Sequence, residues 1–451
     1  MHQKNRLSVT STQSPSPHWS RRRFLEGAGL TLSGLIVPRP GQAQARPEAL
    51  ILHARAGSAA LRGPTHAASP ITGFEGASPG PLLRVRRGDE LRISIANELS
   101  DSLAVHWHGV RVPNAMDGVP YLTQIPIAAG ASFDYRFTPP DAGTFWYHAR
   151  LSAAGGSRGL YGALIVDETQ PVEVDHDVLL MFDEWRLAAD GAPGRAQASD
   201  AAATRHPTIN GGPSFDIPVR GNERLRLRLV NASLRALTLR MERHRIMVLA
   251  VDGQPAQPYY ARDSRVLLGP GNRMDLLVDV DPDSAGSSAI ILEGERDTPL
   301  ARLLHQAGGP ARPNPRPEAR ALPASALPER MDFRSALKLD IPISDTPERV
   351  DLQALAKTRP LFSVKRGRTV MLGIVNRTKA AHAMHLHGHH FRLLDALDDG
   401  WKPFWMDTLP IPVSQTGRIA FVADNPGKWL IRCHRLDEEE TSMAAWFEVT
   451  S

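Results

Sequence analysis

The chain has 451 residues, which is too long for one ordinary domain and enough for about three. Charged residues are 22% and hydrophobic residues 42% of the chain, with 36 Gly and 37 Pro. This composition excludes a disordered chain and a helical bundle, and it favours a globular, turn-rich, all-β protein. The formal net charge is +5.

Residues 1–45 resemble a twin-arginine signal peptide. The basic stretch SRRRFL at 20–25 precedes a short apolar run at 27–37, and AQA at 43–45 is a small-residue cleavage site. These 45 residues contain six Lys or Arg and one Glu, so the rest of the chain has a formal charge of zero. A neutral chain gives no electrostatic reason to expect nucleic acid or an anionic membrane as partner. We therefore predict a periplasmic protein, exported folded and not inserted in the membrane.

One sequence pattern occurs three times. Residues 85–97 read VRRGDELRISIAN, residues 219–231 VRGNERLRLRLVN, and residues 364–376 VKRGRTVMLGIVN. In each copy a glycine turn is followed by alternating apolar residues, which is typical of a half-buried strand. The copies start 134 and 145 residues apart, so the repeating unit is a whole domain.

The repeats predict three β-sandwich domains. We place the first domain at 46–170, the second at 171–306 and the third at 331–451. Residues 307–330 form a proline-rich connector, which we expect to run extended along the surface because proline cannot donate to a sheet. No transmembrane segment is predicted after the signal.

Pairs of histidines follow the repeats in the first and third domains. Nine and eleven residues after the shared asparagine lie His106 and His108 in the first domain and His385 and His387 in the third, whereas the second has Arg240 at the first of these positions and no histidine. Residues two apart in a strand point to the same face, with α-carbons about 7 Å apart. Two imidazoles so placed suit two adjacent metal ions. The same pair in two repeats favours metal binding over ordinary packing.

A second matched pair lies near the end of each of these domains. The segment GTFWYHAR at 143–150 aligns with GKWLIRCH at 427–434, so each domain has one histidine and one arginine there: His148 with Arg150, and His434 with Arg432. If the first and third domains pack together, these strands meet at their interface. Cys433 is the one cysteine of the chain, so no internal disulfide forms.

These motifs resemble those of the multicopper oxidases, the laccase and bilirubin oxidase family. The family carries HWHG, YHxH, HPxHLHGH and HCHxxxHxxxxM, and this chain has HWHG at 106, YHAR at 147, HAMHLHGH at 382 and RCHRLDEEETSM at 432. TING at 208–211 and LGPGNR at 268–273 fit the family's ligand-free middle domain. The resemblance covers the whole mature chain and implies three cupredoxin-like Greek-key domains with copper as cofactor.

Carried over residue by residue, the resemblance makes His106 and His385 the ligands of a type 2 copper. It makes His108, His148 and His434 the ligands of one type 3 copper. The other type 3 copper would have His387, but Arg150 and Arg432 stand in the places of its two remaining histidines. Arginine offers no lone pair, so we expect that copper to be absent.

The type 1 site that the resemblance implies is also altered. His382, Cys433 and Met443 match its ligands, but Glu438 stands in place of the second histidine. A carboxylate is a harder ligand that favours Cu(II), so we expect a lowered potential or an empty site. Asp117 and Glu439 resemble the carboxylates that supply protons for oxygen reduction in relatives, although each can also be an ordinary surface acid.

Two functional hypotheses follow. In the first, the protein is a copper oxidoreductase that oxidises a small-molecule or metal-ion reductant and passes electrons towards dioxygen with fewer than four coppers. In the second, it is a copper-poor or copper-free scaffold that binds other proteins in the periplasm, as in FtsP/SufI-type proteins, which it also resembles. The retained histidines favour the first, and Arg150, Arg432 and Glu438 favour the second.

Overall fold

The structure is a computed structural model that describes residues 49–151, 159–193, 204–343, 350–395, 400–401, 404–435 and 441–451. The side chains at 395, 400, 401, 434, 435, 441 and 442 are not part of that description. The predicted signal peptide at 1–45 lies outside the described residues, as do Glu438 and Glu439. The chain divides into two units, residues 1–47 and 48–451, and the second contains everything described below.

Residues 50–167 form two sheets around one core. Their strand orders are β2-β1-β4-β6 and β3-β8-β7-β5. The strands are β1 (Leu50–Ala59), β2 (Ser69–Phe74), β3 (Leu83–Arg86), β4 (Leu91–Asn97), β5 (Leu103–His108), β6 (Ser132–Phe137), β7 (Gly143–Leu151) and β8 (Tyr161–Asp167), with the short 3-10 helix η1 (Asn114–Met116) after β5. Ile93 and Ile95 of the first sheet share a buried cluster with Val105 and Leu164 of the second. The two sheets therefore pack face to face as a sandwich.

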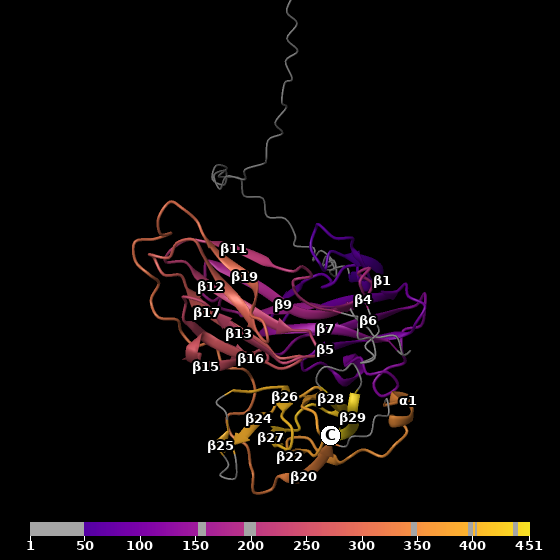
Figure 1. Ribbon diagram of the computed structural model, residues 1–451. Helices are drawn as coiled ribbons and strands as arrows, with labels where there is room; N and C mark the ends of the chain where they lie inside the picture. Colours follow the sequence, from indigo (N-terminus) through magenta and orange to yellow (C-terminus); the bar gives the residue numbers. More distant parts are fainter. Residues whose placement is uncertain are drawn as a thin grey trace, which may run out of the picture. The chain divides into compact units, whose positions relative to one another are not determined.

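The middle of the chain forms two further sheets, with strand orders β10-β9-β12-β17-β14-β15 and β11-β19-β18-β13-β16. The strands are β9 (His176–Leu187), β10 (Thr204–Ile209), β11 (Phe215–Val219), β12 (Arg224–Asn231), β13 (Leu237–Met241), β14 (Ile246–Val251), β15 (Gln254–Tyr260), β16 (Arg265–Leu268), β17 (Arg273–Asp279), β18 (Ser287–Glu293) and β19 (Thr298–His305), with the 3-10 helix η2 (Arg262–Ser264). Figure 1 shows these strands in magenta to orange.

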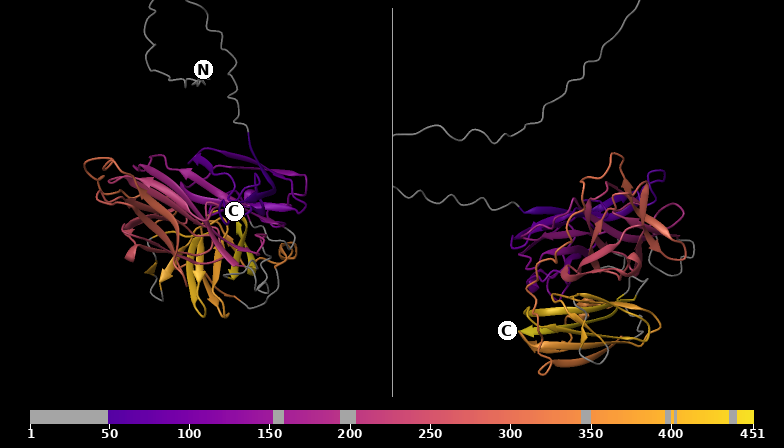
Figure 2. Two further views of the ribbon diagram at one scale, coloured as in Figure 1. Left: turned by 45° about the horizontal axis from the view of Figure 1, so that its top comes forward. Right: turned by 90° about the vertical axis from the view of Figure 1, so that its left-hand side faces the viewer.

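The last part of the chain forms two sheets with strand orders β20-β22-β27-β24-β25 and β21-β29-β28-β23-β26. The elements are β20 (Leu337–Ile343), α1 (Leu352–Leu355), β21 (Ser363–Lys365), β22 (Thr369–Asn376), β23 (His382–Leu386), β24 (Arg392–Asp395), β25 (Gly400–Trp401), β26 (Thr408–Ile411), β27 (Thr416–Val422), β28 (Gly427–Arg435) and β29 (Thr441–Thr450). Figure 2 shows them in orange to yellow from two further directions. Within the described residues nearly all of the regular secondary structure is strand, which confirms the predicted all-β, cupredoxin-like fold.

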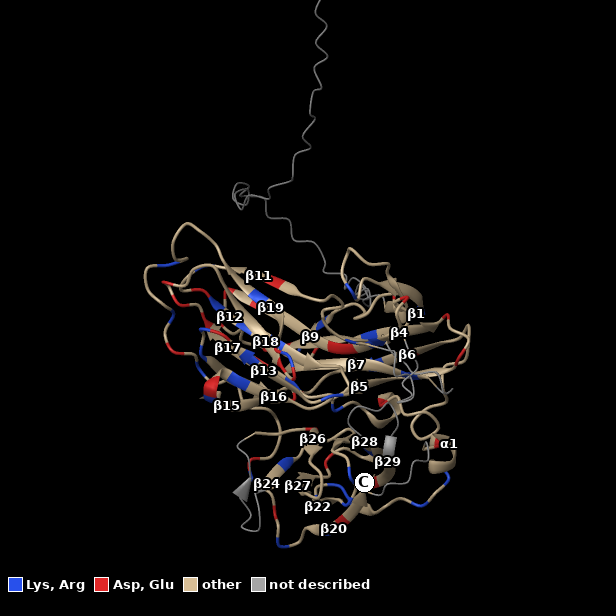
Figure 3. Cartoon of the chain, viewed as in Figure 1, with Lys and Arg blue, Asp and Glu red and all other residues tan. Residues whose placement is uncertain are grey.

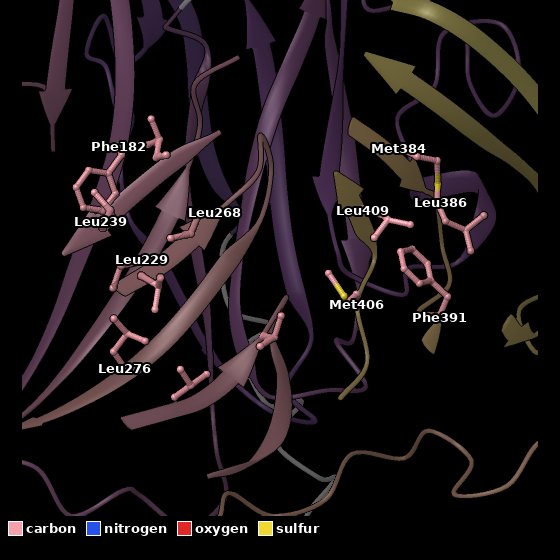
Figure 4. Packing of buried hydrophobic residues seen from close by; sticks show 14 of the residues in the cluster. Phe182, Leu229, Leu239, Leu268, Leu276, Met384, Leu386, Phe391, Met406 and Leu409 are labelled. Carbon is pink, nitrogen blue, oxygen red and sulfur yellow. The ribbon is translucent and has the colours of Figure 1, made fainter. Parts of the chain in front are cut away.

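The apolar faces of the middle and last sheets belong to one buried cluster. Figure 4 shows one group of its side chains, with Phe182 and Leu239, on the middle strands, and another, with Met384 and Leu409, on the last ones. Residues 306–336 between them contain no strand. Arg312 and Arg316 of this connector donate to Asp175, at 3.0 and 2.8 Å. Ion pairs thus attach the connector to the chain just before β9.

The asparagine that ends each sequence repeat has the same role in all three copies. Asn97, Asn231 and Asn376 are buried, and each side-chain amide donates to the backbone carbonyl four residues further on, at 2.9, 2.7 and 2.8 Å. Each side-chain carbonyl also accepts the N–H two residues further on, at 3.1, 3.0 and 3.0 Å. The asparagine therefore fixes the bend that leads into the next strand, where the histidines of the first and last copies lie.

The prediction of a half-buried strand is wrong for the middle copy. In β4 buried and partly buried residues alternate, but every residue of β12 is buried. Its arginines lie on one face and are neutralised there: Arg226 pairs with Asp275 at 2.5 Å and Arg228 with Asp177 at 2.6 Å. Blue and red bands mark such charges on the middle strands in Figure 3. A strand with charged residues at alternate positions can be buried on both faces where each charge has a partner.

No helix in the described part of the chain has the length and apolar character needed to cross a membrane.

Candidate metal centre

Strands β5, β7, β23 and β28 carry most of the predicted metal ligands; His387 directly follows β23, and Met443 lies on β29. In the first repeat β5 pairs antiparallel with β7, so that His106 lies opposite His148 and Ala104 opposite Arg150. In the last repeat β23 pairs antiparallel with β28, so that His385 lies opposite Arg432. Strand pairing thus places each arginine on the same face of its sheet as the histidines.

His106 and His385 meet across the two repeats, although 279 residues separate them. Their Nε2 atoms are 3.2 Å apart, and both rings are buried. The Nδ1 atom of His106 lies 2.9 Å from the carbonyl oxygen of Asp117, and that of His385 lies 3.0 Å from the carbonyl oxygen of Asp407. A carbonyl oxygen can only accept, so each Nδ1 carries the proton and each Nε2 presents a lone pair.

Two lone pairs that face each other at 3.2 Å in a buried place repel unless a cation lies between them. A metal ion bonded to both nitrogens at roughly 2.0–2.1 Å fits this separation. The ring nitrogens of His108 lie close to the same pair, because one ligand atom from each of His106, His108 and His385 lies within 4.8 Å of the other two. The residues present therefore fit a metal ion at this pair.

His108 lies flat against His385, with ring centroids 3.8 Å apart. Its Nε2 atom is 2.9 Å from the hydroxyl of Thr408. Burial and the neighbouring His385 hold the pKa of His108 well below its usual range. Burial likewise lowers the pKa of His385. Both imidazoles are therefore neutral at physiological pH, as metal ligation requires.

His387 has one occupied and one unpartnered ring nitrogen. Nδ1 donates to the carboxylate of Asp117, at 3.0 and 3.2 Å to its two oxygens, whereas Nε2 is buried without a hydrogen-bond partner. Burial lowers the pKa of His387 to about 3. The pKa of Asp117 would be raised by its burial, but the adjacent His387 and His106 outweigh that effect and hold it below the usual range. Asp117 is therefore ionised, and its carboxylate fixes the orientation of the His387 ring.

His148 completes the described histidines on this side. Its ring lies 5.4 Å from that of His106 and 4.5 Å from that of Trp146, measured between ring centroids. Burial and the surrounding histidines hold its pKa well below the usual range. His434 lies opposite Ala383 in the strand pairing, on the same face of the sheet as Arg432 and His385, but its side chain is outside the description.

The other face of the same strand pair carries the predicted type 1 ligands. Cys433 lies opposite Met384 on one side and Met443 on the other, and His382 is two residues from Met384. His382, Cys433 and Met443 therefore share one face of these strands, as a common site would require. The Nε2 atom of His382 lies 2.7 Å from the hydroxyl of Thr378. Burial raises the pKa of the Cys433 thiol to about 12, so a metal ion must displace its proton.

Five residues that hold the histidines in place were not predicted from the sequence. These are Asp252, Asn272 and Arg273 of the middle sheets and Asp407 and Thr408 at the start of β26. In the sequence, residues 268–273 indicate only a fit to the family's middle domain and no contact with the histidines. A Gly-Pro-Gly sequence followed by two polar residues is the one signal that could have indicated a close approach of backbone.

Known proteins resemble this chain in sequence and in fold. Sequence models described as multicopper oxidase match residues 58–171, 176–298 and 328–451. The multicopper oxidase MmcO of Mycobacterium tuberculosis is 29% identical over 424 residues, covering 81% of this chain and 80% of that protein. The structure of Lac15 from a marine microbial metagenome is similar with a TM-score of 0.77 and 34% identity, over 89% of this chain and 100% of that one. A multicopper oxidase from Pseudomonas thermotolerans gives a TM-score of 0.77 and 31% identity, over 89% and 99% of the two chains.

Proposed function

Since this chain belongs to the multicopper oxidase family, and is an oxidoreductase of laccase type, we propose that it binds copper at the histidines described above and oxidises a small reductant, with electron transfer towards dioxygen. The observation that carries the proposal is the pair of Nε2 lone pairs of His106 and His385, 3.2 Å apart. Copper, when bound, accepts electrons singly and delivers them to dioxygen.

The copper set is incomplete in this proposal. His106 and His385 hold one ion, and His108, His148 and His434 hold a second. Arg150 and Arg432 occupy the strand positions predicted for the remaining ligands. A guanidinium group is permanently cationic and has no lone pair to give to a metal ion. The unpartnered Nε2 of His387 is then the one ligand left for a third ion.

The electron-accepting site is formed by His382, Cys433 and Met443, with Glu438 as the fourth group. A carboxylate in place of imidazole stabilises Cu(II) and so slows electron uptake from the reductant. The reductant is a small molecule or a metal ion. The signal-like residues 1–45 support export to the periplasm by the twin-arginine route.

Asp117 and Glu439 are the proposed acid groups for oxygen reduction. The contacts of Asp117 favour a role as acceptor, since it receives the Nδ1–H of His387 and lies 3.3 Å from Nδ1 of His106. A carboxylate with a lowered pKa is a poor proton donor at rest. We therefore assign proton delivery chiefly to Glu439 and the orientation of the two imidazoles to Asp117.

The first test is the copper content per chain of protein exported with copper supplied, together with its visible spectrum and its oxygen consumption with phenolic and metal-ion reductants. The proposal predicts stoichiometric copper, fewer than four ions, and oxygen consumption that depends on the reductant. Absence of stoichiometric copper would contradict it. That outcome would favour the copper-free scaffold, a hypothesis that Arg150, Arg432 and Glu438 support. The next step would then be a search for periplasmic protein partners.

A further inference from the structure

The loop 268–273 of the middle sheets touches the metal centre directly. Gly271 has a φ of +83°, and a Cβ atom there would lie 2.8 Å from Cε1 and 3.0 Å from Nε2 of His108. A Cβ atom at Gly269 would lie 2.4 Å from Pro410 of β26. The ring of His108 therefore occupies the space in which a side chain of this loop would stand.

Arg273, the last residue of the loop, holds Asp407 with both arms of its guanidinium group. Nη1 donates to Oδ1 at 2.9 Å and Nη2 to Oδ2 at 2.6 Å, and both side chains are buried. The pair also explains the glycine of HWHG, because a Cβ atom at Gly109 would lie 2.0 Å from Nη2 of Arg273. A paired, planar arrangement of this kind fixes the carboxylate in position and in orientation.

Asp252 and Asn272 hold the backbone of the same segment. The Asn272 side-chain amide donates to the carbonyl oxygen of Thr408 at 2.9 Å and to Asp252 at 3.0 Å. The backbone N–H groups of Asp407 and Thr408 donate to Oδ2 of Asp252, at 3.2 and 3.3 Å. Residues 407 and 408 are thus held by the middle sheets through side chain and backbone alike.

The Thr408 hydroxyl links this fixed segment to the two histidines by hydrogen bonds. It donates its single proton to Oδ1 of Asp407 at 2.7 Å. It can then only accept from the two imidazoles, from Nε2 of His108 at 2.9 Å and from Nδ1 of His385 at 3.0 Å. His108 consequently offers Nδ1 to a metal ion, whereas His385 offers Nε2.

We infer that Asp252 and the loop 268–273, which supply no ligand, are the positioning element of the metal centre: through Asp407 and Thr408 they determine which ring nitrogen His108 and His385 present. The identity of the metal ion as copper rests on the proposed function. The choice of nitrogen does not, because it follows from hydrogen bonds within the protein. Groups that orient metal-binding histidines in this way contribute roughly 10- to 100-fold to metal affinity.

The test compares Thr408→Val with Thr408→Ser in the full chain. Valine keeps the shape of threonine and removes the acceptor, and serine keeps the hydroxyl. Long-range proton–nitrogen NMR of ¹⁵N-histidine-labelled, metal-free protein reports which ring nitrogen is protonated, with His108→Gln and His385→Gln to assign the signals. We expect wild type and Thr408→Ser to protonate His108 on Nε2, and Thr408→Val to weaken that preference, because only the Asp407 carboxylate, 3.3 Å away, then remains to accept the proton.

Copper affinity, measured by competition with a chelator, gives the second readout. We expect Thr408→Val to bind copper roughly 10- to 100-fold more weakly and Thr408→Ser within about threefold of wild type. Arg273→Lys, which keeps the charge and loses the paired contact, should weaken binding in the same direction. Thermal unfolding of the metal-free variants separates this effect from loss of fold.

Equal tautomers and equal copper affinities in the valine and serine variants would overturn the positioning role while leaving copper binding intact. A wild-type protein that binds no copper but shows the tautomer contrast would overturn the proposed function and leave the role of Thr408 standing. If Thr408→Val does not fold, Arg273→Lys with wild-type tautomers and affinity would overturn the inference instead.

Discussion

Two clusters of histidines, one fully buried and one buried only at His244, differ in the groups that their ring nitrogens contact. At the metal centre backbone carbonyls accept the Nδ1 protons of His106 and His385, and the two Nε2 atoms face each other at 3.2 Å. In the middle sheets His244 and His305 flank the hydroxyl of Ser288, each with Nε2 3.0 Å from Oγ. A hydroxyl in this position can donate to one ring and accept from the other.

The difference lies in the polar group between the rings. The Ser288 hydroxyl lies within hydrogen-bond distance of both facing nitrogens and can satisfy both, so the His244 cluster needs no cation. Between His106 and His385 no side chain of the described residues plays that part, and a cation is required to join the two lone pairs. Burial of histidines alone therefore does not indicate a metal site, whereas the position of the N–H acceptors does.

The largest expected effect comes from introducing histidine at the three predicted ligand positions that lack it. The variant Arg150→His, Arg432→His, Glu438→His should bind additional copper, turn blue and gain oxidase activity, because each change replaces a poor or non-binding group by an imidazole at a predicted ligand position. Elemental analysis and oxygen consumption measure the gain. Arg55→His with Arg136→His, on exposed strand positions, is the control. No additional copper in the triple variant would show that the ligand assignment is wrong.

Gly109→Ala tests how tightly the centre is built. The new Cβ atom meets Arg273 at 2.0 Å and Asp407 at 2.6 Å, at a φ of +82°. We expect the free energy of unfolding to fall by about 3 kcal/mol or more, measured by denaturant on metal-free protein. Gly130→Ala has a φ of +74° and nothing within 4 Å, so it should cost about 1–2 kcal/mol for the backbone strain alone. Equal losses would mean that the loop yields to the clash.

The burial of His244 should make the free energy of unfolding depend on pH. Burial, with a smaller effect of His305, lowers the pKa of His244 to about 4, below the unfolded value of roughly 6.5. The unfolded state then binds more protons, so the free energy of unfolding falls as the pH drops from about 6.5 to 4, by at most about 1.4 kcal/mol per pH unit. His244→Gln should flatten this dependence in metal-free protein. If the difference in the free energy of unfolding between the two proteins stays constant over this pH interval, His244 is not held neutral by its burial, and this prediction is contradicted.

The sequence predicted the fold class and the family because both leave repeated traces: three strand-and-asparagine patterns, and motifs in a fixed order. The approach of His106 to His385 could be predicted from the same position of the two pairs in two repeats. The roles of Thr408 and Arg273 could not, because their partners come from three distant segments with no common spacing. The burial of β12 was missed for the same reason, since the aspartates that neutralise its arginines lie on other strands.

Several predictions concern residues that the structure does not describe. Glu438 and Glu439 lie outside the described residues, and of His434 the strand position is described but not the side chain. The division into domains at 46–170, 171–306 and 331–451, with a linker at 307–330, also stays a prediction. The family matches and the described sheets are compatible with it.

Copper retention by wild type, His385→Ala and His244→Ala tests the central claim most directly. Each protein is loaded with copper, dialysed against a chelator and analysed for copper per chain. We expect wild type and His244→Ala to retain the same stoichiometric copper and His385→Ala to retain less, because only His385 faces another lone pair. Equal retention by all three proteins, or no retention by wild type, would contradict the assignment of the His106–His385 pair as a copper site.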